Sequence, residues 1–529
     1  MKGSDLFAKA LKHESVRHIF GIPGEENIDL LDSISQTDIN FILTRHEQGA
    51  AFMADAYARV SKKPGVCLST LGPGATNLLT GVANAHLDRV PLVAITAQAP
   101  RDRVHKESHQ NVDTIELFSG VTKYNRAVIV GESIPEIVRK AFSSAMKDQP
   151  GAAHIQLPED IARNQVVEQL MVPIPEEAIY EASGKVISSA AELVNSAKLP
   201  VILAGNGVIR SSSWNKLRKF AEKTGILVVN TFMSKGMLPY DHPLNLFTIG
   251  GRPFPMELRP LIHSDLVIAV GFDIVEYDPV IWNVDSSRKV INISSTMAEM
   301  DEHFPVAFDL VGNIGITLDL LMKKVNKRAM PEEFTGIRER RKQFLESPGK
   351  GQEKIPKEIL KILSSENRQN TLVISDVGLH KIWVGRYYHP NFPDRTIIYN
   401  GFASMGGALP GSVGALMANP GLDVISINGD GGFLMNVQEL ETAHRLGLSF
   451  TAIVFNDRAY SLIEKHQIDA GLPTAHVHFT NPDFSLLAKS FHCDHHLVQD
   501  GKDFGRALKE SRKASGIDII EVVIPDMQD

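Results

Sequence analysis

A strand, turn, helix and strand pattern near the end of the chain constrains its fold more than any other feature. Residues 423–428 form a short apolar run that leads into the tight turn Gly429-Asp430-Gly431. A helical pattern follows to about Leu446, and a second apolar run covers residues 450–455. Two apolar strands joined by a helix are typical of a parallel sheet, because parallel strands need a long crossover connection. This stretch therefore predicts an α/β fold.

The same pattern brings two acidic side chains together. Asp430 follows the first apolar run, and Asp457 follows the second, 27 residues further on. Since parallel strands end at one edge of their sheet, both carboxylates can bind one hard cation such as Mg²⁺. Gly431 and Gly432 let the backbone approach phosphate oxygens, and the start of a helix offers free N–H groups. A diphosphate carried on a divalent cation suits this stretch, and an ordinary βαβ unit with a glycine turn is the alternative.

Length and composition limit the classes of protein that the chain can belong to. Its 529 residues predict about three domains. A net charge of −7 gives no indication of nucleic acid or of an anionic membrane as a partner, and no apolar run reaches the roughly 18 residues of a membrane span. The only two cysteines, Cys67 and Cys493, argue against a disulfide framework and fit a cytoplasmic location.

Strand and helix patterns alternate along three segments, which we expect to form three doubly wound parallel-sheet domains with helices on both faces. Polar linkers rich in proline or glycine are expected at residues 170–182 and 323–353. Ser4 is expected to cap the first helix. The predicted domains are 1–168, 185–328 and 355–529. The predicted strands are 18–21, 40–44, 66–70, 91–96, 200–203, 226–230, 266–270, 290–293, 371–375, 423–428, 450–455 and 517–524.

The Gly-Asp-Gly turn followed further on by Asn456 resembles the cofactor signature of enzymes that use thiamine diphosphate. The commoner ending of that signature is Asn-Asn, whose second residue is a metal ligand, and this chain has Asp457 in its place. The resemblance implies that Asp430, Asp457 and the backbone carbonyl of Ala459 bind Mg²⁺. It also implies that Gly429, Gly431 and Gly432 contact the diphosphate.

Residues 45–54 resemble the segment of these enzymes that carries a catalytic glutamate, and Glu47 matches that residue. In the family, this glutamate contacts the aminopyrimidine ring of the cofactor and promotes the loss of a proton from C2 of the thiazolium ring. Taken alone, Glu47 is also an ordinary first-turn helix glutamate, which the helix dipole favours. The loop at residues 72–77 supports the resemblance, which implies that Gly72, Pro73 and Asn77 line the cofactor site.

The resemblance assigns further positions in the last segment. Met405 matches the apolar residue that keeps the cofactor bent, although it would also suit a core. The carbonyl of Ala403 falls where the family accepts a hydrogen bond from the 4′-amino group. His380 follows Asp376 where the family has a side chain on the diphosphate, and an exposed loop histidine is the alternative. Tyr460 follows the metal ligands and either contacts the cofactor or packs against its neighbours.

The resemblance covers nearly the whole chain and is closest to the acetolactate synthases, whose pattern residues 21–27, 44–60, 70–77 and 105–125 follow. It implies decarboxylation of one pyruvate and condensation of the hydroxyethyl unit with a second pyruvate, which gives 2-acetolactate and CO₂. Gln110 matches a glutamine at the mouth of the active site, and it is either a substrate contact or a polar surface residue. The alternatives are a related 2-keto-acid decarboxylase or carboligase, a pyruvate oxidase, and a non-catalytic cofactor-binding protein.

Residues 271–279 resemble the matching segment of the catabolic acetolactate synthases, which lack FAD. Tyr460 after Asn456-Asp457 also resembles the catabolic type. The FAD-binding type carries an Arg-Phe-Asp-Asp-Arg-like segment at this place. Gly205-Asn206-Gly207 also lacks the third glycine of a dinucleotide-binding loop. We therefore expect thiamine diphosphate and Mg²⁺ as cofactors, without FAD.

In this family, the catalytic glutamate and the metal site of one active site come from different chains. The resemblance therefore implies a homodimer or homotetramer, in which the first domain of one chain meets the third domain of another. A regulatory small subunit is not expected, because the chain ends at Asp529 without the longer tail of many biosynthetic relatives.

Overall fold

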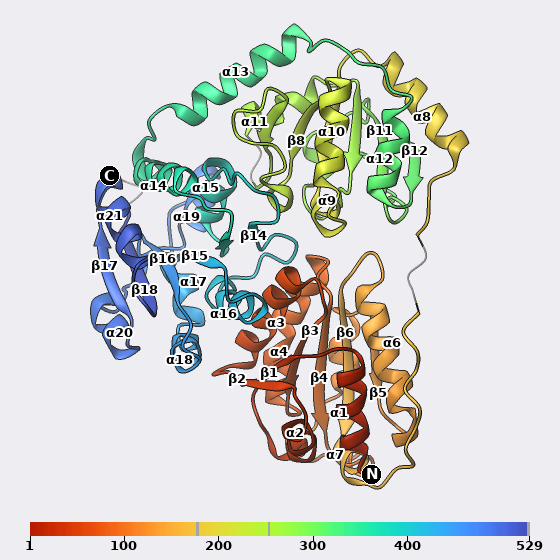
Figure 1. The fold of residues 1–529 in the computed structure, drawn as a ribbon. Coiled ribbons are helices and arrows are strands. Elements are labelled where there is room, and N and C mark those ends of the chain that lie inside the picture. The colour runs from red at the N-terminus through yellow and green to blue at the C-terminus, as the bar shows by residue number, and fades with distance from the viewer. Residues whose placement is uncertain (176–178, 252–253, 526–529) are drawn as a thin grey trace.

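A computed structural model describes residues 1–175, 179–251 and 254–525 (Figure 1). Three six-stranded sheets follow one another along the chain, each flanked by helices. Their strands pair in parallel, which confirms the predicted α/β class. Residues 176–178 of the first predicted linker and the end of the third predicted domain, 526–529, lie outside the described residues. The domain limits themselves stay a prediction.

The first sheet has the strand order β2-β1-β3-β4-β6-β5. The strands β3, β4 and β6 are buried at every residue, because helices cover both faces of the sheet, and this explains why they are mainly apolar. The strands are β1 (His18–Gly21), β2 (Asn40–Leu43), β3 (Gly65–Ser69), β4 (Leu92–Gln98), β5 (Tyr124–Ala127) and β6 (Ala152–Pro158). The helices are α1 (Gly3–His13), α2 (Ile28–Ser35), α3 (Glu47–Ser61), α4 (Pro73–Leu87), α5 (Thr114–Ser119), α6 (Ile134–Met146) and α7 (Glu159–Arg163).

The predicted role of Ser4 as the first helix cap is wrong. Helix α1 already begins at Gly3, so Ser4 lies within its first turn. The backbone N–H of Lys2 donates to the Asp5 carboxylate at 3.0 Å, and the Ser4 hydroxyl accepts from Ser33 at 2.8 Å. Asp5 therefore satisfies a backbone donor at this helix start, and Ser4 joins α1 to α2.

The second sheet has the strand order β12-β11-β10-β7-β8-β9. Its strands are β7 (Pro200–Ala204), β8 (Leu227–Asn230), β9 (Asn245–Thr248), β10 (Leu266–Val270), β11 (Lys289–Ser294) and β12 (Val306–Val311). The helices around it are α8 (Gly184–Ser196), α9 (Asn206–Arg210), α10 (Trp214–Thr224), α11 (Pro255–Ile262) and α12 (Ile314–Met322).

The second predicted linker contains a helix that the sequence analysis missed. Helix α13 (Glu332–Glu346) spans the distance from the second sheet to the third domain (Figure 1). It buries only Phe334, Ile337 and Arg341. Because most of its residues are polar and exposed, its composition is typical of a solvated linker. The Arg341 guanidinium donates to the carbonyl of Thr248 at 2.8 Å, which fixes the helix to the end of β9.

The third sheet has the strand order β14-β13-β15-β16-β18-β17. Its strands are β13 (Thr371–Ser375), β14 (Thr396–Ile398), β15 (Asp423–Gly429), β16 (Phe450–Asn456), β17 (Asp494–Val498) and β18 (Ile517–Val523). Its helices are α14 (Lys354–Ser365), α15 (Leu379–Tyr387), α16 (Ala408–Ala418), α17 (Asp430–Met435), α18 (Glu439–Arg445), α19 (Ser461–Asp469), α20 (Phe484–Ser490) and α21 (Gly501–Ser511).

The single helix expected after the Gly-Asp-Gly turn is two helices, α17 and α18. They are separated at Asn436, whose backbone leaves the helical region with φ −131°. The Asn436 side chain donates to the carbonyl of Gly406 at 2.7 Å, and Gln438 donates to Asn436 at 3.2 Å. This break gives α18 its own direction, toward the first domain.

The first and third domains share one apolar core, in which α3 packs against α16. Small residues on both helices allow a close approach, and a Cβ on Gly414 would lie 2.0 Å from the backbone oxygen of Met53. Phe52 and Tyr399 pack beside this crossing, with ring centroids 5.6 Å apart. The position of α3 relative to the third sheet is therefore set by direct backbone contact.

We predict that Gly414→Ala lowers the thermal unfolding midpoint, because the added methyl group pushes α3 and α16 apart. Overpacking of this kind costs about 1–3 kcal/mol. Gly505→Ala in α21 is the matched control, since nothing lies within 4 Å of a Cβ at that helical position. Differential scanning fluorimetry checks the result, and equal midpoints for both variants would contradict the close contact.

Candidate functional site

A cleft with a volume of about 360 Å³ opens at the carboxyl edge of the third sheet, where β13, β15 and β16 end. Its walls come from the turns and helix starts that follow these strands. All ten site residues predicted in the third domain line this cleft, namely His380, Ala403, Met405, Gly429, Asp430, Gly431, Gly432, Asp457, Ala459 and Tyr460. The register of the parallel strands thus brings together residues from four separate stretches of the chain.

Asp430, which is buried, and Asp457, which is half-buried, are a pair of carboxylates that line the cleft. Asp430 accepts hydrogen bonds from the backbone N–H of Arg458 and from the side chain of Asn481, both at 2.7 Å. Asp457 accepts from the Ser461 hydroxyl at 2.6 Å. Burial raises the pKa of both groups, and with the charge of Asp430 it brings that of Asp457 to about 7. A divalent cation between them would stabilise both charged forms.

The donor set fits a hard cation. The carboxylates of Asp430 and Asp457 and the carbonyl of Ala459 are oxygen ligands of the kind that Mg²⁺ prefers. Within the described ranges, no group of three or more His, Cys, Asp and Glu side chains forms another candidate metal site. Asn481 was not predicted, and as a polar residue in a polar segment it gave no signal in the sequence.

Neighbouring side chains leave no room for a Cβ atom at Gly431 or Gly432 in the turn that follows β15. A Cβ on Gly432 would lie 2.1 Å from the Asp376 carboxylate, and one on Gly431 would lie 2.8 Å from the Tyr460 ring. The backbone N–H of Gly431 donates to the Asp430 carboxylate at 2.8 Å, and without Cβ atoms at Gly431 and Gly432 a ligand oxygen can approach the backbone here. This arrangement suits a phosphate group.

Asp376 holds the turn at Gly406 and Gly407, beside the cleft residue Met405, a role that the sequence analysis missed. Its buried carboxylate accepts from the backbone N–H groups of Gly406 and Gly407, both at 3.0 Å. Burial raises its pKa to about 6, although these donors favour the charged form. The turn that Asp376 fixes carries Met405 and Ala403, and Ala403 has a left-handed φ of 54°. A lone carboxylate directly after the buried strand β13 was the available signal.

His380 is not an exposed loop residue. It is the second residue of α15 and is only 5% exposed. Its Nε2 atom has no hydrogen-bond partner among the described residues, and burial lowers its pKa to about 3, so the ring is neutral. An unpaired ring nitrogen next to Gly429 is available to a ligand in the cleft. Tyr460 is 39% exposed, and its ring packs on Phe479 with centroids 5.0 Å apart.

The predicted site residues of the first domain form a second group. Glu47 is the first residue of α3, is nearly buried, and accepts a hydrogen bond from the Asn77 amide at 2.9 Å. Pro73 is the first residue of α4, and Gly72 before it has a left-handed φ of 48°. A Cβ on Gly72 would lie 2.5 Å from the carbonyl oxygen of Gln110, so the exposed loop that carries Gln110 packs against this turn.

The two groups do not meet within one chain. Every residue that lines the cleft belongs to residues 377–463 of the third domain, and none comes from the first. In a single copy of the chain, Glu47 therefore lies outside the cleft.

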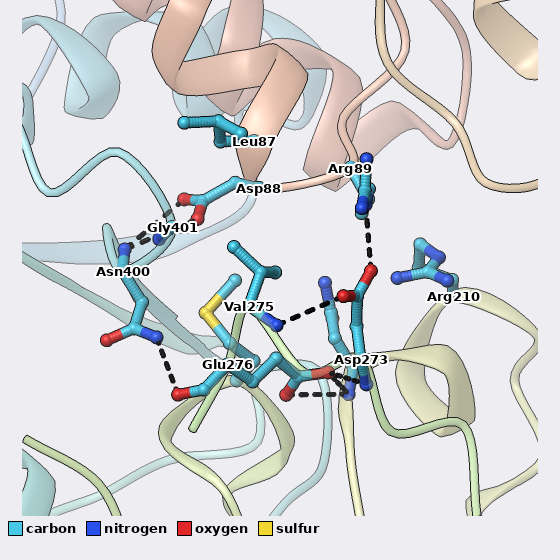
Figure 2. A pocket seen from close by; sticks show the side chains of 11 residues that line it. Leu87, Asp88, Arg89, Arg210, Asp273, Val275, Glu276, Asn400 and Gly401 are labelled. Atoms are coloured by element: carbon cyan, nitrogen blue, oxygen red, sulfur yellow. Dashed lines mark hydrogen bonds and ion pairs between the residues drawn. The ribbon is translucent and has the colours of Figure 1, made fainter. Parts of the chain in front are cut away.

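The central domain meets the other two at a small polar junction (Figure 2). Asp273 pairs with Arg89 of the first domain at 2.8 Å, and the Asn400 amide of the third domain donates to the carbonyl of Glu276 at 3.0 Å. The Glu276 carboxylate accepts from the backbone N–H of Asn206 at 2.9 Å and from Thr231 at 2.6 Å. Burial raises the pKa of Glu276 to about 7.

The Glu276 carboxylate lies at the start of α9, at the backbone N–H of Asn206. Asn206 begins α9 directly after β7, and a dinucleotide phosphate commonly binds the N–H groups at such a helix start. Here the chain supplies its own carboxylate to that N–H group.

Comparisons with known proteins agree with this geometry. The N-terminal TPP binding domain of thiamine pyrophosphate enzymes matches residues 1–117, their central domain matches 187–321, and their C-terminal TPP binding domain matches 376–522. Thiamine pyrophosphate is another name for thiamine diphosphate. An acetolactate synthase of Bacillus subtilis (strain 168) is 33% identical over 99% of this chain and 93% of the relative. The chain belongs to the acetolactate synthase family of thiamine pyrophosphate enzymes.

Other members of the acetolactate synthase family align equally fully. The catabolic acetolactate synthase of Raoultella terrigena is 30% identical over 99% of this chain and 95% of the relative. A probable large subunit from Methanocaldococcus jannaschii is 33% identical over 99% and 92%. The predicted resemblance is confirmed. None of the helices in the described ranges has the length and apolar character that a membrane span requires.

We predict that Asp376→Asn destabilises the turn at Gly406 and Gly407. An amide can accept only one of the two N–H groups through its oxygen and points its own NH₂ at the other, which costs about 1–3 kcal/mol for a buried unpaired donor. The thermal unfolding midpoint should fall relative to Asp102→Asn, an exposed control. No difference between the two variants would mean that the turn is held by other contacts.

Proposed function

We propose that the chain is an acetolactate synthase, which decarboxylates one pyruvate and condenses the two-carbon unit with a second pyruvate to give 2-acetolactate and CO₂. The observation that carries this proposal is the pair of complementary site halves. The third domain has a cleft lined by the carboxylates of Asp430 and Asp457, and the first domain has Glu47 hydrogen-bonded to Asn77. Both lie in domains that match TPP binding domains.

Each residue of the cleft has a proposed role toward the cofactor. Asp430, Asp457 and the Ala459 carbonyl would bind Mg²⁺, and the N–H groups of the Gly431-Gly432 turn would bind the diphosphate. Gly429 and the unpaired nitrogen of His380 would complete the diphosphate contacts. The carbonyl of Ala403 would accept from the 4′-amino group, Met405 would support the bend of the cofactor, and Tyr460 would line the cleft beside it. When bound, thiamine diphosphate supplies the electron sink for the decarboxylation.

The first domain would supply proton transfer and substrate contact. Asn77 orients one carboxylate oxygen of Glu47, which leaves the other to hold a proton at a ring nitrogen of the cofactor. A carboxyl group positioned in this way within a nearly buried site is suited to general acid–base work. Gly72 and Pro73 would line the same ring, and Gln110 would contact the substrate from the loop beside Gly72.

The proposed assembly is a homodimer or homotetramer with shared sites. The cleft takes no residue from the first domain of its own chain, so Glu47 would reach the cleft of a partner chain. The Glu276 carboxylate at the start of α9 supports the absence of FAD. We further propose a cytoplasmic location, supported by two free, buried cysteines, and no regulatory small subunit.

The purified protein should form 2-acetolactate from pyruvate when thiamine diphosphate and Mg²⁺ are present, and it should show no flavin absorbance. Removal of the cation with EDTA should abolish the activity, because the diphosphate then faces Asp430 and Asp457 without a bridging charge, and Mg²⁺ should restore it. Product analysis checks the reaction. Acetaldehyde as the main product would favour a decarboxylase, and cofactor binding without turnover would favour a non-catalytic protein.

Shared sites predict complementation between inactive chains. A Glu47→Ala chain lacks the proton-transferring carboxyl group, and an Asp430→Ala chain lacks a metal ligand, so each alone should be inactive. Mixed under conditions of subunit exchange, they form hybrids with one intact site, and up to about half of the activity per hybrid dimer should return. No recovery, with exchange confirmed by native mass spectrometry, would rule out sites shared in this way.

A further inference from the structure

Glu439 is a fully buried carboxylate for which the proposed reaction has no use. It is the first residue of α18 and is 0% exposed. None of the ion pairs in the described part of the chain involves it. Its oxygens accept from the backbone N–H of Arg45 at 3.1 Å and of His46 at 3.0 Å, and from the Thr442 hydroxyl at 2.7 Å. Burial raises its pKa to about 7, while these donors favour the charged form.

The contacts of Glu439 surround Glu47. Arg45 and His46 directly precede Glu47, at which the 15-residue helix α3 begins. The N–H groups at a helix start lack partners within the helix and attract an anion. On the other side of Glu47, a Cβ on Gly49 would lie 2.6 Å from Oε1 of Glu439. Glu439 therefore holds the backbone just before Glu47 by hydrogen bonds and lies close to the backbone just after it, from another domain of the same chain.

The origin of Glu439 explains why it reaches this place. Helix α18 starts after the break at Asn436, which directs it away from α17 and toward the first domain. Thr442, one turn later, donates to the second carboxylate oxygen and leaves the first to face Arg45 and His46. A hydrogen bond within α18 thus orients the Glu439 side chain toward the start of α3.

We propose that Glu439 is a positioning residue for Glu47, which holds the start of α3 so that the Glu47 carboxyl keeps its orientation toward Asn77 and the cofactor ring. The inference rests on the proposed function, because it takes the role of Glu47 from there. Glu439 touches neither cofactor nor substrate in this scheme. Its removal leaves two backbone N–H groups without a partner and frees the first turn of α3. A shift of about 1 Å at such a group can cost about 100-fold in rate.

The test compares Glu439→Ala with Glu441→Ala, a control two residues along the same helix whose partly exposed side chain pairs with Arg445 at 3.1 Å. We expect Glu439→Ala to lower kcat about 100-fold, with a Kd for thiamine diphosphate that stays within about 3-fold of the parent. In the cofactor-free protein, amide hydrogen exchange in a peptide covering residues 44–49 should become faster. Glu439→Gln should recover part of both, because its one carbonyl oxygen still accepts from the backbone.

Unchanged kcat and unchanged exchange in Glu439→Ala would overturn the inference, and so would a loss of kcat without faster exchange at 44–49. If Glu439→Ala does not fold, Gly49→Ala displaces the same carboxylate from the other side and should lower kcat in the same way; full activity in that variant would overturn the inference. Glu47→Gln is measured in parallel. If Glu47→Gln is fully active, the proposed role of Glu47 fails, and the exchange rates still decide whether Glu439 holds the segment.

Discussion

The close crossing of α3 and α16 is the contact on which the arrangement of this molecule depends. It joins the first and third domains in one apolar core and leaves no room for a side chain at Gly414. Because Glu47 is the first residue of α3, this crossing sets the direction in which the first domain presents it. The cleft of the third domain opens elsewhere, at the ends of β13, β15 and β16. The chain thus holds Glu47 and the cleft at two separate places, which is consistent with the active site shared between chains that we propose.

Buried carboxylates perform two different tasks in this structure. Asp376, Glu276 and Glu439 each accept hydrogen bonds from backbone N–H groups of a turn or a helix start. Their charge is satisfied by the chain itself, so they fix local geometry. Asp430 and Asp457 also accept hydrogen bonds from backbone N–H groups, those of Arg458 and Ala459, but both line the cleft of the third domain. Their access to the cleft separates these candidate cation ligands from the carboxylates that only fix local geometry.

Patterns that depend on local physics could be predicted from the sequence. Apolar runs predicted buried strands such as β10 and β13, because both faces of those strands are covered. Glycine turns after strands predicted the cleft. The sequence analysis missed polar elements such as β17 and α13. They bury few residues, so their sequences show no regular spacing of apolar side chains. Asp376 and Glu439 act through contacts with turns far away in the sequence, so no local pattern marks them.

The core of the central domain is built from residues 187–337, and among the described residues of that range Phe232 alone belongs to the buried core of the third domain. Its contacts with the rest of the molecule are mainly polar, such as Arg89 with Asp273 and Asn400 with Glu276. The central domain can therefore change its own core without changing the core that the first and third domains share. Substitutions in the shared core, in contrast, affect the positions of both Glu47 and the cleft.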